Sequence, residues 1–567
     1  MKKRILAVTL AFAMVLALTA CGGGAGGGPA ASDNGGANTT AGNVDVGQLT
    51  GAGSGLKHAE GQNTVDEATK QEIIDSHTNA DGKTFISIAT ASNCSSFEPY
   101  KSIKNTNIFG KPVYEGLYSR CGVGGEYVPV IAESTEKIDD TTYRVKIKDY
   151  IYDSQGNHIT ASDVKFSYWD VAKETYNNGY FRQLNRVEVV DDYTVDFYMD
   201  TPSEALFIKM TYNYVWSEKA FTDSGDSMAS WPTGTGPYVV TDWVSGSYVT
   251  YEKRDDYWET DPAKIAECSE ANVDIMNYKV IKDEAQMVIA LQTGEADISE
   301  NLSAKNISFF SGDSNYNVFS ELNNKTLLIA FNCNQDYSPC GDVYLRQAIL
   351  YATDRNALSI GVYDGQGAES KGPTTPTAAD FNPEWLNNEY YAYNLEKAQE
   401  CLEQSGYDGE ELVILVEAED ELNKGAQVLQ NCLLAVGINT TITAVESALY
   451  TTYRYDPAQY DIQLMTSGCS DFGINSWVQN CDTSEIGTSN MGVQDLELYE
   501  ILMDAVDKAP GDSESVEILY DYLTDNAMYV GLYNSMKSIV CDTAVTSCVT
   551  DYAQYVNPAA CTYAWNG

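Results

Sequence analysis

The sequence predicts an α/β protein built from two unequal lobes. Its second half alternates strands with amphipathic helices in β-α-β order, which is typical of a parallel or mixed sheet with flanking helices. Its first half is richer in short strands that pair as antiparallel hairpins. About 510 of the 567 residues follow a low-complexity N-terminal stretch, and at roughly 100–200 residues per domain they make about three to four domains or subdomains.

The first half is predicted to contain mainly strands. Residues 84–89 and 143–148 are runs rich in β-forming side chains. Residues 187–198 are predicted to form a hairpin around a turn of two aspartates. Thr160 and Asp163 resemble a capping box, so a helix is expected to begin there. The other elements expected in this half are a turn at 233–238, strands at 248–251 and 278–281, and a helix at 284–293.

The second half alternates strands with capped helices. Asp342 and Asn394 are predicted N-caps, because each precedes a helix whose apolar residues share one face. Gly406 is the expected C′ residue of the second of these helices. A strand at 461–465 leads into the loop 466–471, and ligands of α/β sheets tend to bind beyond such carboxyl ends of strands. The other elements expected here are strands at 327–332, 412–416 and 438–443 and a helix at 424–436.

The N-terminus resembles the signal peptide of a bacterial lipoprotein. A basic start (MKKR) precedes an apolar run at 5–18, which is too short to span a ~30 Å bilayer comfortably. The following motif, LTAC, resembles a lipobox, so residues 1–20 are the expected signal peptide and Cys21 the expected lipidation site. Residues 21–58 are mostly small and polar and are expected to be a lipid-anchored flexible tether. An ordinary signal peptide with a cysteine at this position is the alternative.

Composition argues against several classes of function. A net charge of −46 repels phosphate backbones, so no nucleic-acid partner is expected. The chain has three histidines and neither a Walker A motif nor a G-x-S-x-G motif, so no catalytic residue, metal or cofactor is expected. Without Cys21, twelve cysteines remain. Disulfides in an exported protein and reduced core residues are both open, and the pairing cannot be read from the sequence.

Several motifs occur in a fixed order between residues 84 and 550. They are VYEGLY at 113–118 before YVPVIAE at 127–133, DSQGNHITASDV at 153–164, GTGPY at 234–238 before RDDYW at 254–258, FN at 331–332, DVYLRQA at 342–348 continuing to ATDR at 352–355, KA at 397–398 with GY at 406–407, and VGI at 436–438. In this order and spacing they resemble the extracellular solute-binding proteins, family 5, of ABC importers that carry oligopeptides, dipeptides or nickel.

The resemblance implies a two-lobed periplasmic-binding-protein-like fold of type II, similar to cluster C, with an extra subdomain in the first lobe. The implied bounds are 84–325 for lobe I, about 111–231 for the inserted subdomain, 326–529 for lobe II and 530–567 for a return to lobe I. Hinges are expected near 321–325 and 528–533, where they would let the lobes close.

The implied function is a substrate-binding lipoprotein without catalytic activity. It would capture oligopeptides or dipeptides in an interlobe cleft and deliver them to the permease and ATPase subunits of an ABC importer. It would act as a monomer on the outer face of the bacterial cytoplasmic membrane, at the cell surface or in the periplasm, held there by lipid on Cys21. Nickel chelate, haem or oligosaccharide as cargo, a surface hydrolase and a peptide sensor are the alternatives.

Asp471 is the main candidate for a ligand contact. The segment 467–471 resembles the Ser-x-Cys-x-Asp loop whose aspartate holds the α-ammonium of the peptide in family members, and such a charge-assisted bond is strong. Gly468 stands where peptide binders often have tryptophan, and a solvated loop aspartate is the alternative role of Asp471. The other candidate contacts are Gly468, Cys469 and Ser470 of the same loop, Asn93, Cys94 and Ser95 of the first cleft loop, Gly234, Thr235 and Gly236, Asn332 and Asn334 at a strand end, and Trp477, for which core packing is equally open.

Overall fold

The computed structural model describes residues 59–61, 63, 65–100, 106–122, 126–173, 184–200, 205–469, 473–474, 477, 495–508 and 513–566. All of them belong to one folded unit, Gly42–Gly567. The expected signal peptide and the whole of the expected tether, Cys21 included, lie outside the described residues, and so do Ser470 and Asp471.

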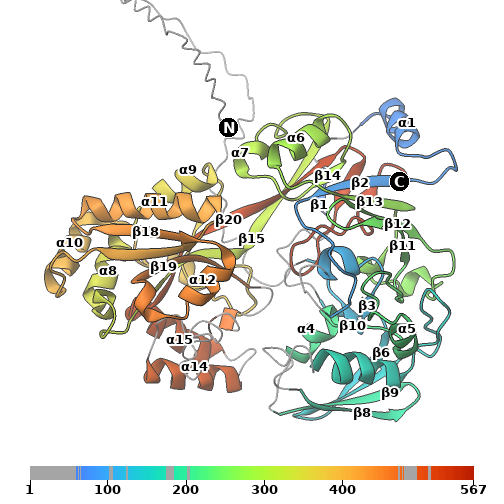
Figure 1. Ribbon diagram of the computed structural model, residues 1–567, viewed down its shortest axis with the longest axis horizontal. Coiled ribbons are helices and arrows are strands. Elements are labelled where there is room, and N and C mark those ends of the chain that lie inside the picture. Colours follow the sequence, from blue (N-terminus) through green and yellow to red (C-terminus); the bar gives the residue numbers. More distant parts are fainter. Residues whose placement is uncertain are drawn as a thin grey trace, which may run out of the picture. The chain divides into compact units, whose positions relative to one another are not determined.

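A mixed sheet of eleven strands runs through the described part of the chain (Figure 1). β2 is parallel to β13 and β14, β17 is parallel to β18 and β19, and β15 is antiparallel to both β19 and β20. The sheet order is β11 (Tyr238–Val244), β12 (Tyr248–Lys253), β13 (Ile275–Val280), β2 (Phe85–Thr90), β14 (Ile298–Ser299), β20 (Tyr529–Asp542), β15 (Tyr316–Phe331), β19 (Ile462–Gly468), β17 (Leu412–Glu417) and β18 (Thr440–Val445), with β16 (Gly367–Glu369) paired to β20. The expected mixed α/β architecture is therefore confirmed.

The strands β15 and β20 join the two parts of this sheet. We call the part from β11 to β14, with its attached elements, lobe I, and the part formed by β19, β17, β18 and their helices lobe II. Pairing between β15 and β20 is interrupted between Leu322, opposite Met536, and Thr326, opposite Asn534. We call this interruption the crossover. On β15 the crossover falls in the first expected hinge, 321–325. On β20 it covers residues 534–536, because these residues face the β15 segment in the antiparallel register. They lie beyond the second expected hinge, 528–533.

Lobe I contains three hydrophobic clusters among the described residues. One packs on the large sheet, a second packs on a four-stranded antiparallel sheet with the order β6-β7-β9-β8, and a smaller one lies around α6 and α7. Helix α3 (Ala161–Lys165) begins at the expected capping box, where the N–H and the hydroxyl of Thr160 both donate to the Asp163 carboxylate. The strands of the smaller sheet are β6 (Ala132–Asp139), β7 (Thr142–Ile147), β8 (Leu184–Asp191) and β9 (Thr194–Met199). The other elements are β1 (Ala59–Glu60), β3 (Glu115–Gly116), β4 (Tyr118–Ser119), β5 (Val128–Pro129), β10 (Tyr214–Val215), β21 (Val545–Cys548), β22 (Thr562–Tyr563), α1 (Glu67–Ser76), α4 (Ala205–Tyr212), α5 (Glu218–Asp223), α6 (Glu284–Gln292) and α7 (Ala304–Ile307).

Lobe II packs capped helices against β17, β18 and β19 around one large core (Figure 1). Asp342 accepts the N–H groups of Tyr344 and Leu345, and Asn394 accepts that of Lys397, so both expected N-caps are confirmed. Gly406 follows the C-cap residue Ser405 and is therefore the C′ residue, as expected, although it has no positive φ. The helices are α8 (Val343–Ala352), α9 (Arg355–Tyr363), α10 (Leu395–Gln404), α11 (Asp420–Ala435), α12 (Ser447–Tyr453), α14 (Leu496–Lys508) and α15 (Ser513–Asp525).

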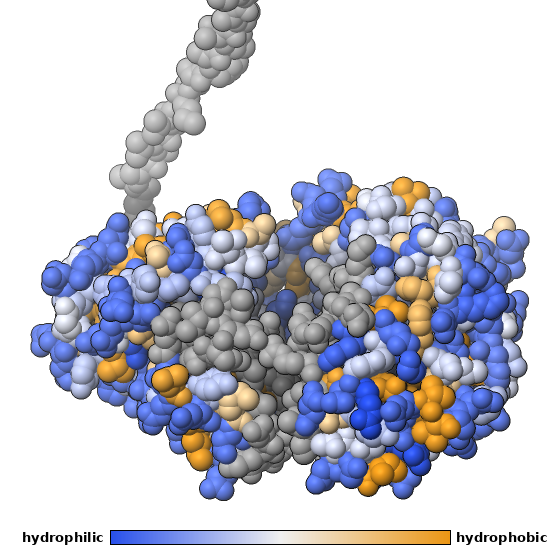
Figure 2. All heavy atoms as spheres, turned by 60° about the horizontal axis from the view of Figure 1, so that its bottom comes forward, coloured by the Kyte–Doolittle hydropathy of each residue, from blue (hydrophilic) through white to orange (hydrophobic). Residues whose placement is uncertain are grey.

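The described cysteines are of both kinds that the sequence left open. Cys121 and Cys268 form a disulfide across a sequence separation of 147 residues. The nine other described cysteines are thiols, and most of them are buried. Among the described residues, no helix is long and apolar enough to cross a membrane. The face shown in Figure 2 is mainly hydrophilic, with apolar side chains scattered over it, as a chain of net charge −46 would suggest.

His77 fastens the end of α1 to lobe I. Its Nε2 lies 3.3 Å from Asp297 Oδ1, and its ring packs against Phe85 and Trp565. Burial acts to lower the pKa of His77, but the hydrogen bond and charge of Asp297, helped by Asp542, outweigh burial, so the pKa is raised above its usual value.

The contact between α1 and lobe I is expected to weaken at alkaline pH. A raised pKa in the folded state gives stability that is fully present below the unfolded-state pKa of His77 and is lost as the pH rises through the folded-state pKa. Hydrogen exchange of residues 67–77, corrected for intrinsic rates, should show less protection at about pH 8.5 than at about pH 6. The variant His77→Phe should remove this dependence, and a wild-type profile that is flat over this range would refute it.

Candidate ligand-binding site

A cavity of about 420 Å³ lies at the crossover. This volume falls within the roughly 300–1,000 Å³ of small-molecule sites. Lobe I, the crossover and lobe II all contribute to its wall. The lining residues are Ser92, Glu300–Ala304, Ile307 and Ala553–Tyr555 from lobe I, Asn323–Lys325 and Ser535–Ser538 from the crossover strands, and Val362, Tyr363, Gln366, Asp420, Glu421 and Lys424 from lobe II.

The fold explains why polar residues meet at this cavity. Ser92 and Glu300 follow the carboxyl ends of the parallel strands β2 and β14, and Asp420 follows the carboxyl end of β17. Strands of parallel sheets end in loops at one edge, and this edge is where ligands of α/β proteins usually bind. The two lobes therefore turn equivalent edges of their sheets toward the same cavity.

Charged groups around the cavity pair with one another. Lys537 lies 3.3 Å from Glu300 in a largely buried ion pair and also donates to the carbonyl of Gln554. On the lobe II side, Lys424 pairs with Asp420 at 2.7 Å, and the Tyr363 hydroxyl donates to Glu421. A wall of both signs suits a polar ligand that itself carries both charges.

The loop that follows β19 begins at the wall of this cavity. Gly468 is paired with Lys325, and the Cys469 N–H donates to the Asn324 carbonyl at 2.8 Å. The Cys469 side chain is buried in the lobe II core. Ser470 and Asp471 lie outside the described residues. The predicted ligand loop is thus attached to two residues that line the cavity.

The first cleft loop touches the cavity only at its beginning. Ser92 lines the cavity, whereas the Asn93 side chain accepts the N–H of Gly246 at 2.6 Å. Cys94 is buried in the lobe I core, and Ser95 is exposed. The backbone of this loop therefore runs from the cavity wall toward the turn between β11 and β12.

Gly234, Thr235 and Gly236 are not among the residues that line the cavity. A Cβ at Gly234 would lie 2.1 Å from the Val113 carbonyl oxygen, and a Cβ at Gly236 would be nearly as close to backbone. Arg254 donates to the carbonyls of both glycines. The tight backbone predicted for this motif therefore packs against the segment before β3, and the carbonyls of Gly234 and Gly236 are already bonded within the protein.

Asn332 and Asn334 lie at the other end of the β15–β19 pair from the ligand loop. The Asn332 N–H donates to the Asp461 carbonyl, and its side chain donates to Pro457 and Tyr460 carbonyls. Since about 20 Å of strand separate this end from Lys325, these asparagines and Gly468 do not share a site. Trp477 is fully buried in the lobe II core, which was one of its two expected roles.

Several cavity residues were not predicted from the sequence. Residues 300–304 and 420–424 follow strands, so their position beyond a strand end was the available signal. Residues 535–538 and 553–555 carry no such signal, because they reach the cavity only through pairing with segments more than 200 residues away.

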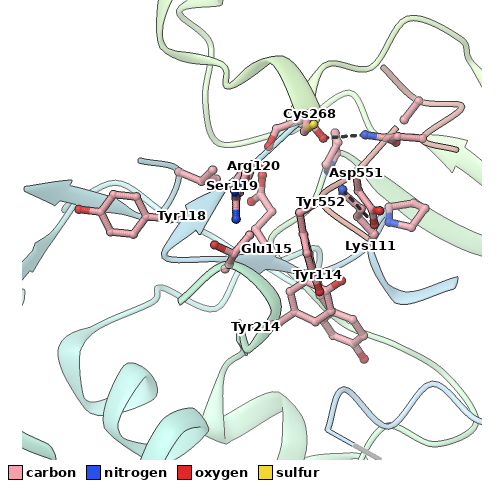
Figure 3. Close-up of a pocket in the computed structure, with 18 of the residues that line it drawn as sticks. Lys111, Tyr114, Glu115, Tyr118, Ser119, Arg120, Tyr214, Cys268, Asp551 and Tyr552 are labelled. Carbon is pink, nitrogen blue, oxygen red and sulfur yellow. Dashed lines mark hydrogen bonds and ion pairs between the residues drawn. The ribbon is translucent and has the colours of Figure 1, made fainter. Parts of the chain in front are cut away.

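A second, smaller cavity of about 40 Å³ lies within lobe I (Figure 3). Figure 3 shows Lys111 and Asp551 pointing toward each other, and their charged atoms are 3.6 Å apart. Burial raises the pKa of Glu115, which accepts hydrogen bonds from Tyr257 and Trp258. A space of this size holds about one or two water molecules, so it is too small for a cargo.

Comparison with known proteins identifies the family. The sequence model of the bacterial extracellular solute-binding proteins, family 5 (middle), matches residues 126–485. The chain therefore belongs to this family, whose members are extracellular binding proteins.

Two relatives show the extent of the similarity in sequence. A glutathione-binding protein of Pectobacterium atrosepticum is 25% identical over 379 residues, which is 64% of this chain and 69% of the relative. The oligopeptide-binding protein AppA of Bacillus subtilis is 25% identical over 473 residues, which is 76% of this chain and 83% of the relative.

Solved structures show the same fold. HbpA2 from Haemophilus parasuis superimposes with a TM-score of 0.72 at 19% identity, over 85% of this chain and all of that chain. A dipeptide-binding protein from Pseudoalteromonas sp. SM9913 in complex with Met-Leu gives a TM-score of 0.70 at 18% identity, again over 85% of this chain and 100% of that chain. The two-lobed periplasmic-binding-protein fold expected from the sequence is therefore confirmed.

Proposed function

We propose that this protein is the substrate-binding lipoprotein of an ABC importer and that its cargo is a short peptide. The observation that carries the proposal is the attachment of the β19 loop to the wall of the interlobe cavity through Gly468 and Cys469. The relatives named for peptides and glutathione support the same class of cargo. The protein binds its cargo without catalysis and passes it to a membrane permease.

Asp471 is the proposed partner of the α-ammonium of the peptide. It follows Cys469 by two residues, and the Cys469 N–H is bonded to Asn324, which lines the cavity. The backbone of Gly468, Cys469 and Ser470 would pair with the peptide main chain, which gives affinity without a strict choice of side chains. The proposed location is the outer face of the cytoplasmic membrane, where lipid on Cys21 anchors the chain through its tether.

The experiment compares peptide binding by the chain from Gly22 onward and by its Asp471→Ala and Asp471→Asn variants. Native mass spectrometry of protein purified without refolding identifies retained cargo, and calorimetry with that peptide measures its affinity. Loss of the carboxylate partner is expected to weaken binding at least about 30-fold, which corresponds to about 2 kcal/mol or more.

Asp336→Ala is the matched control, because Asp336 is an exposed aspartate beyond the far end of β15. It should bind like the wild type. Equal affinity of the Asp471→Ala variant would remove Asp471 from the site, whereas retained metal chelate, haem or sugar in place of peptide would refute the peptide cargo.

A further inference from the structure

The interruption of the β15–β20 ladder deprives several backbone groups of their strand partners. Buried backbone groups need replacement partners, because an unsatisfied one costs free energy comparable to a lost hydrogen bond. One replacement comes from lobe II: the Thr375 hydroxyl donates to the Asn323 carbonyl at 3.0 Å. On the other side of β15, the Cys469 N–H donates to the Asn324 carbonyl at 2.8 Å and so continues the pairing of Lys325 with Gly468.

The other replacements come from a single side chain of lobe I. Gln554 Oε1 accepts the Asn324 N–H at 2.7 Å, and Gln554 Nε2 donates to the Leu322 carbonyl at 2.8 Å. A primary amide offers the same donor and acceptor as a peptide group, so this side chain takes the place of a strand neighbour. It is 1% exposed.

The turn that carries Gln554 is held firmly in lobe I. Asp551 accepts the N–H groups of Ala553 and Tyr555, and it lies beside Lys111 in the small cavity of Figure 3. Gln554 itself has a φ of 61°, in the left-handed region that a residue other than glycine rarely occupies. Strain of this kind persists only where the surroundings fix it, and it is often found where function requires a precise position.

Asn324 is therefore bonded to both lobes. Its N–H is held by Gln554 of lobe I, and its carbonyl is held by Cys469 of lobe II, at the start of the proposed ligand loop. A rotation of one lobe against the other at the crossover must change at least one of these bonds. Asn324 also lines the cavity. The same residue is therefore in reach of bound cargo and is bonded to both lobes.

We propose that Gln554 is a positioning residue that sets the equilibrium between the open and closed arrangements of the lobes and, through it, the rate of cargo release. This inference rests on the proposed function. Gln554 fixes the position of the crossover, to which the start of the β19 loop is bonded. The closed arrangement of the lobes is stable only while the Gln554 amide bonds to both Leu322 and Asn324. Hinged closure around a ligand is the usual motion of such two-lobed proteins.

The test uses Gln554→Leu, which has nearly the same shape but no donor or acceptor. Amide exchange at Asn324 should become about tenfold faster or more, because the N–H loses its partner. Release of the co-purified peptide, followed by stopped-flow displacement, should also accelerate about tenfold, while association changes less. Gln292→Leu is the control, since Gln292 is an exposed residue at the end of α6 and is not among the residues that line the cavity.

Gln554→Glu tests the same inference in a second way. An ionised carboxylate can accept from Asn324 but cannot donate to Leu322, whereas the protonated acid can do both. This variant should release cargo faster than the wild type at neutral pH and regain slow release on acidification. A merely structural residue would not produce this pH-dependent recovery.

Unchanged exchange at Asn324 and unchanged release in Gln554→Leu would overturn the inference. If the wild type binds no peptide, the proposed function fails, and the exchange rate at Asn324 still decides whether Gln554 holds the crossover. If Gln554→Leu does not fold, the pH series of Gln554→Glu decides: a release rate equal to that of the wild type at neutral pH would overturn the inference.

Discussion

Replacing Trp385 by alanine is expected to lower the free energy of unfolding by about 3–5 kcal/mol, which is typical of a buried aromatic side chain that is truncated to alanine. Trp385 is 1% exposed in the lobe II core. Its ring stacks on Tyr520 with centroids 4.0 Å apart and meets Phe381 edge-on, and its Nε1 donates to Glu517 at 2.8 Å. The substitution removes these contacts and leaves a cavity between segments that cannot close over it.

Urea unfolding followed by circular dichroism measures this effect. Trp231→Ala is the matched control, because Trp231 is 52% exposed and truncation of an exposed side chain usually changes stability by about 0.5 kcal/mol or less. Equal midpoints for the two variants would show that Trp385 does not support lobe II. The loss of stability should extend toward the crossover, because Gly372 lies between Trp385 and β20. Gly372 packs beside the Trp385 ring, and the Gly372 carbonyl oxygen would be 2.0 Å from a Cβ at Gly531 of β20.

Features that depend on neighbouring residues could be predicted from the sequence. The caps at Asp342 and Asn394 and the capping box at Thr160 need only a polar side chain and the first turn of the helix, so they appear where expected. Gly406 stands at C′ as expected, but it does not adopt the left-handed conformation that is common at this position. Glycine permits the left-handed conformation but does not require it, and the helix ended in an extended residue instead.

The roles of the arginines could be predicted only in part. From the sequence alone, Arg346 and Arg355 are expected to form ion pairs that hold helices in place, with a ligand contact as the alternative for Arg355. Both are buried and both hold segments together, but Arg346 donates to the carbonyls of Cys340, Gly341 and Asn526, and Arg355 donates to those of Tyr390 and Tyr391. A guanidinium carries five donors, and the sequence does not show whether a distant carbonyl or a carboxylate will meet them.

The candidate site shows the same division between local and distant information. The β19 loop was predicted from its position at a strand end, and the structure places its start at the cavity. Gln554 and Lys537 could not be predicted, because the ladder interruption that Gln554 bridges exists only once β15 and β20 are paired. Asn332 seemed equivalent to the loop residues because it also follows a strand, but β15 and β19 are antiparallel and their carboxyl ends lie at opposite ends of the pair.

The disulfide is the feature for which the sequence left the most alternatives, and its loss is expected to have the second large effect. Reducing Cys121–Cys268 should lower the free energy of unfolding by about 2–5 kcal/mol, because the bond closes a long loop, with a separation of 147 residues, and so restricts the unfolded chain. For domains of this size the thermal midpoint should fall by roughly 5–15 °C. The bond also lies next to the Gln554 turn, since Cys121 forms a β-bridge with Asp551.

Differential scanning calorimetry with and without dithiothreitol tests this expectation, and the double variant Cys121→Ser/Cys268→Ser separates the disulfide from other effects of the reductant. The variant should melt where the reduced wild type melts and should not respond to dithiothreitol, because the nine other described cysteines are thiols already. A wild type whose midpoint is insensitive to reductant, with Cys121 and Cys268 alkylated before reduction, would show that the pair is not joined. If the pair is oxidised, the disulfide joins Cys268 to Cys121, the residue that is bridged to Asp551 in the turn that carries Gln554.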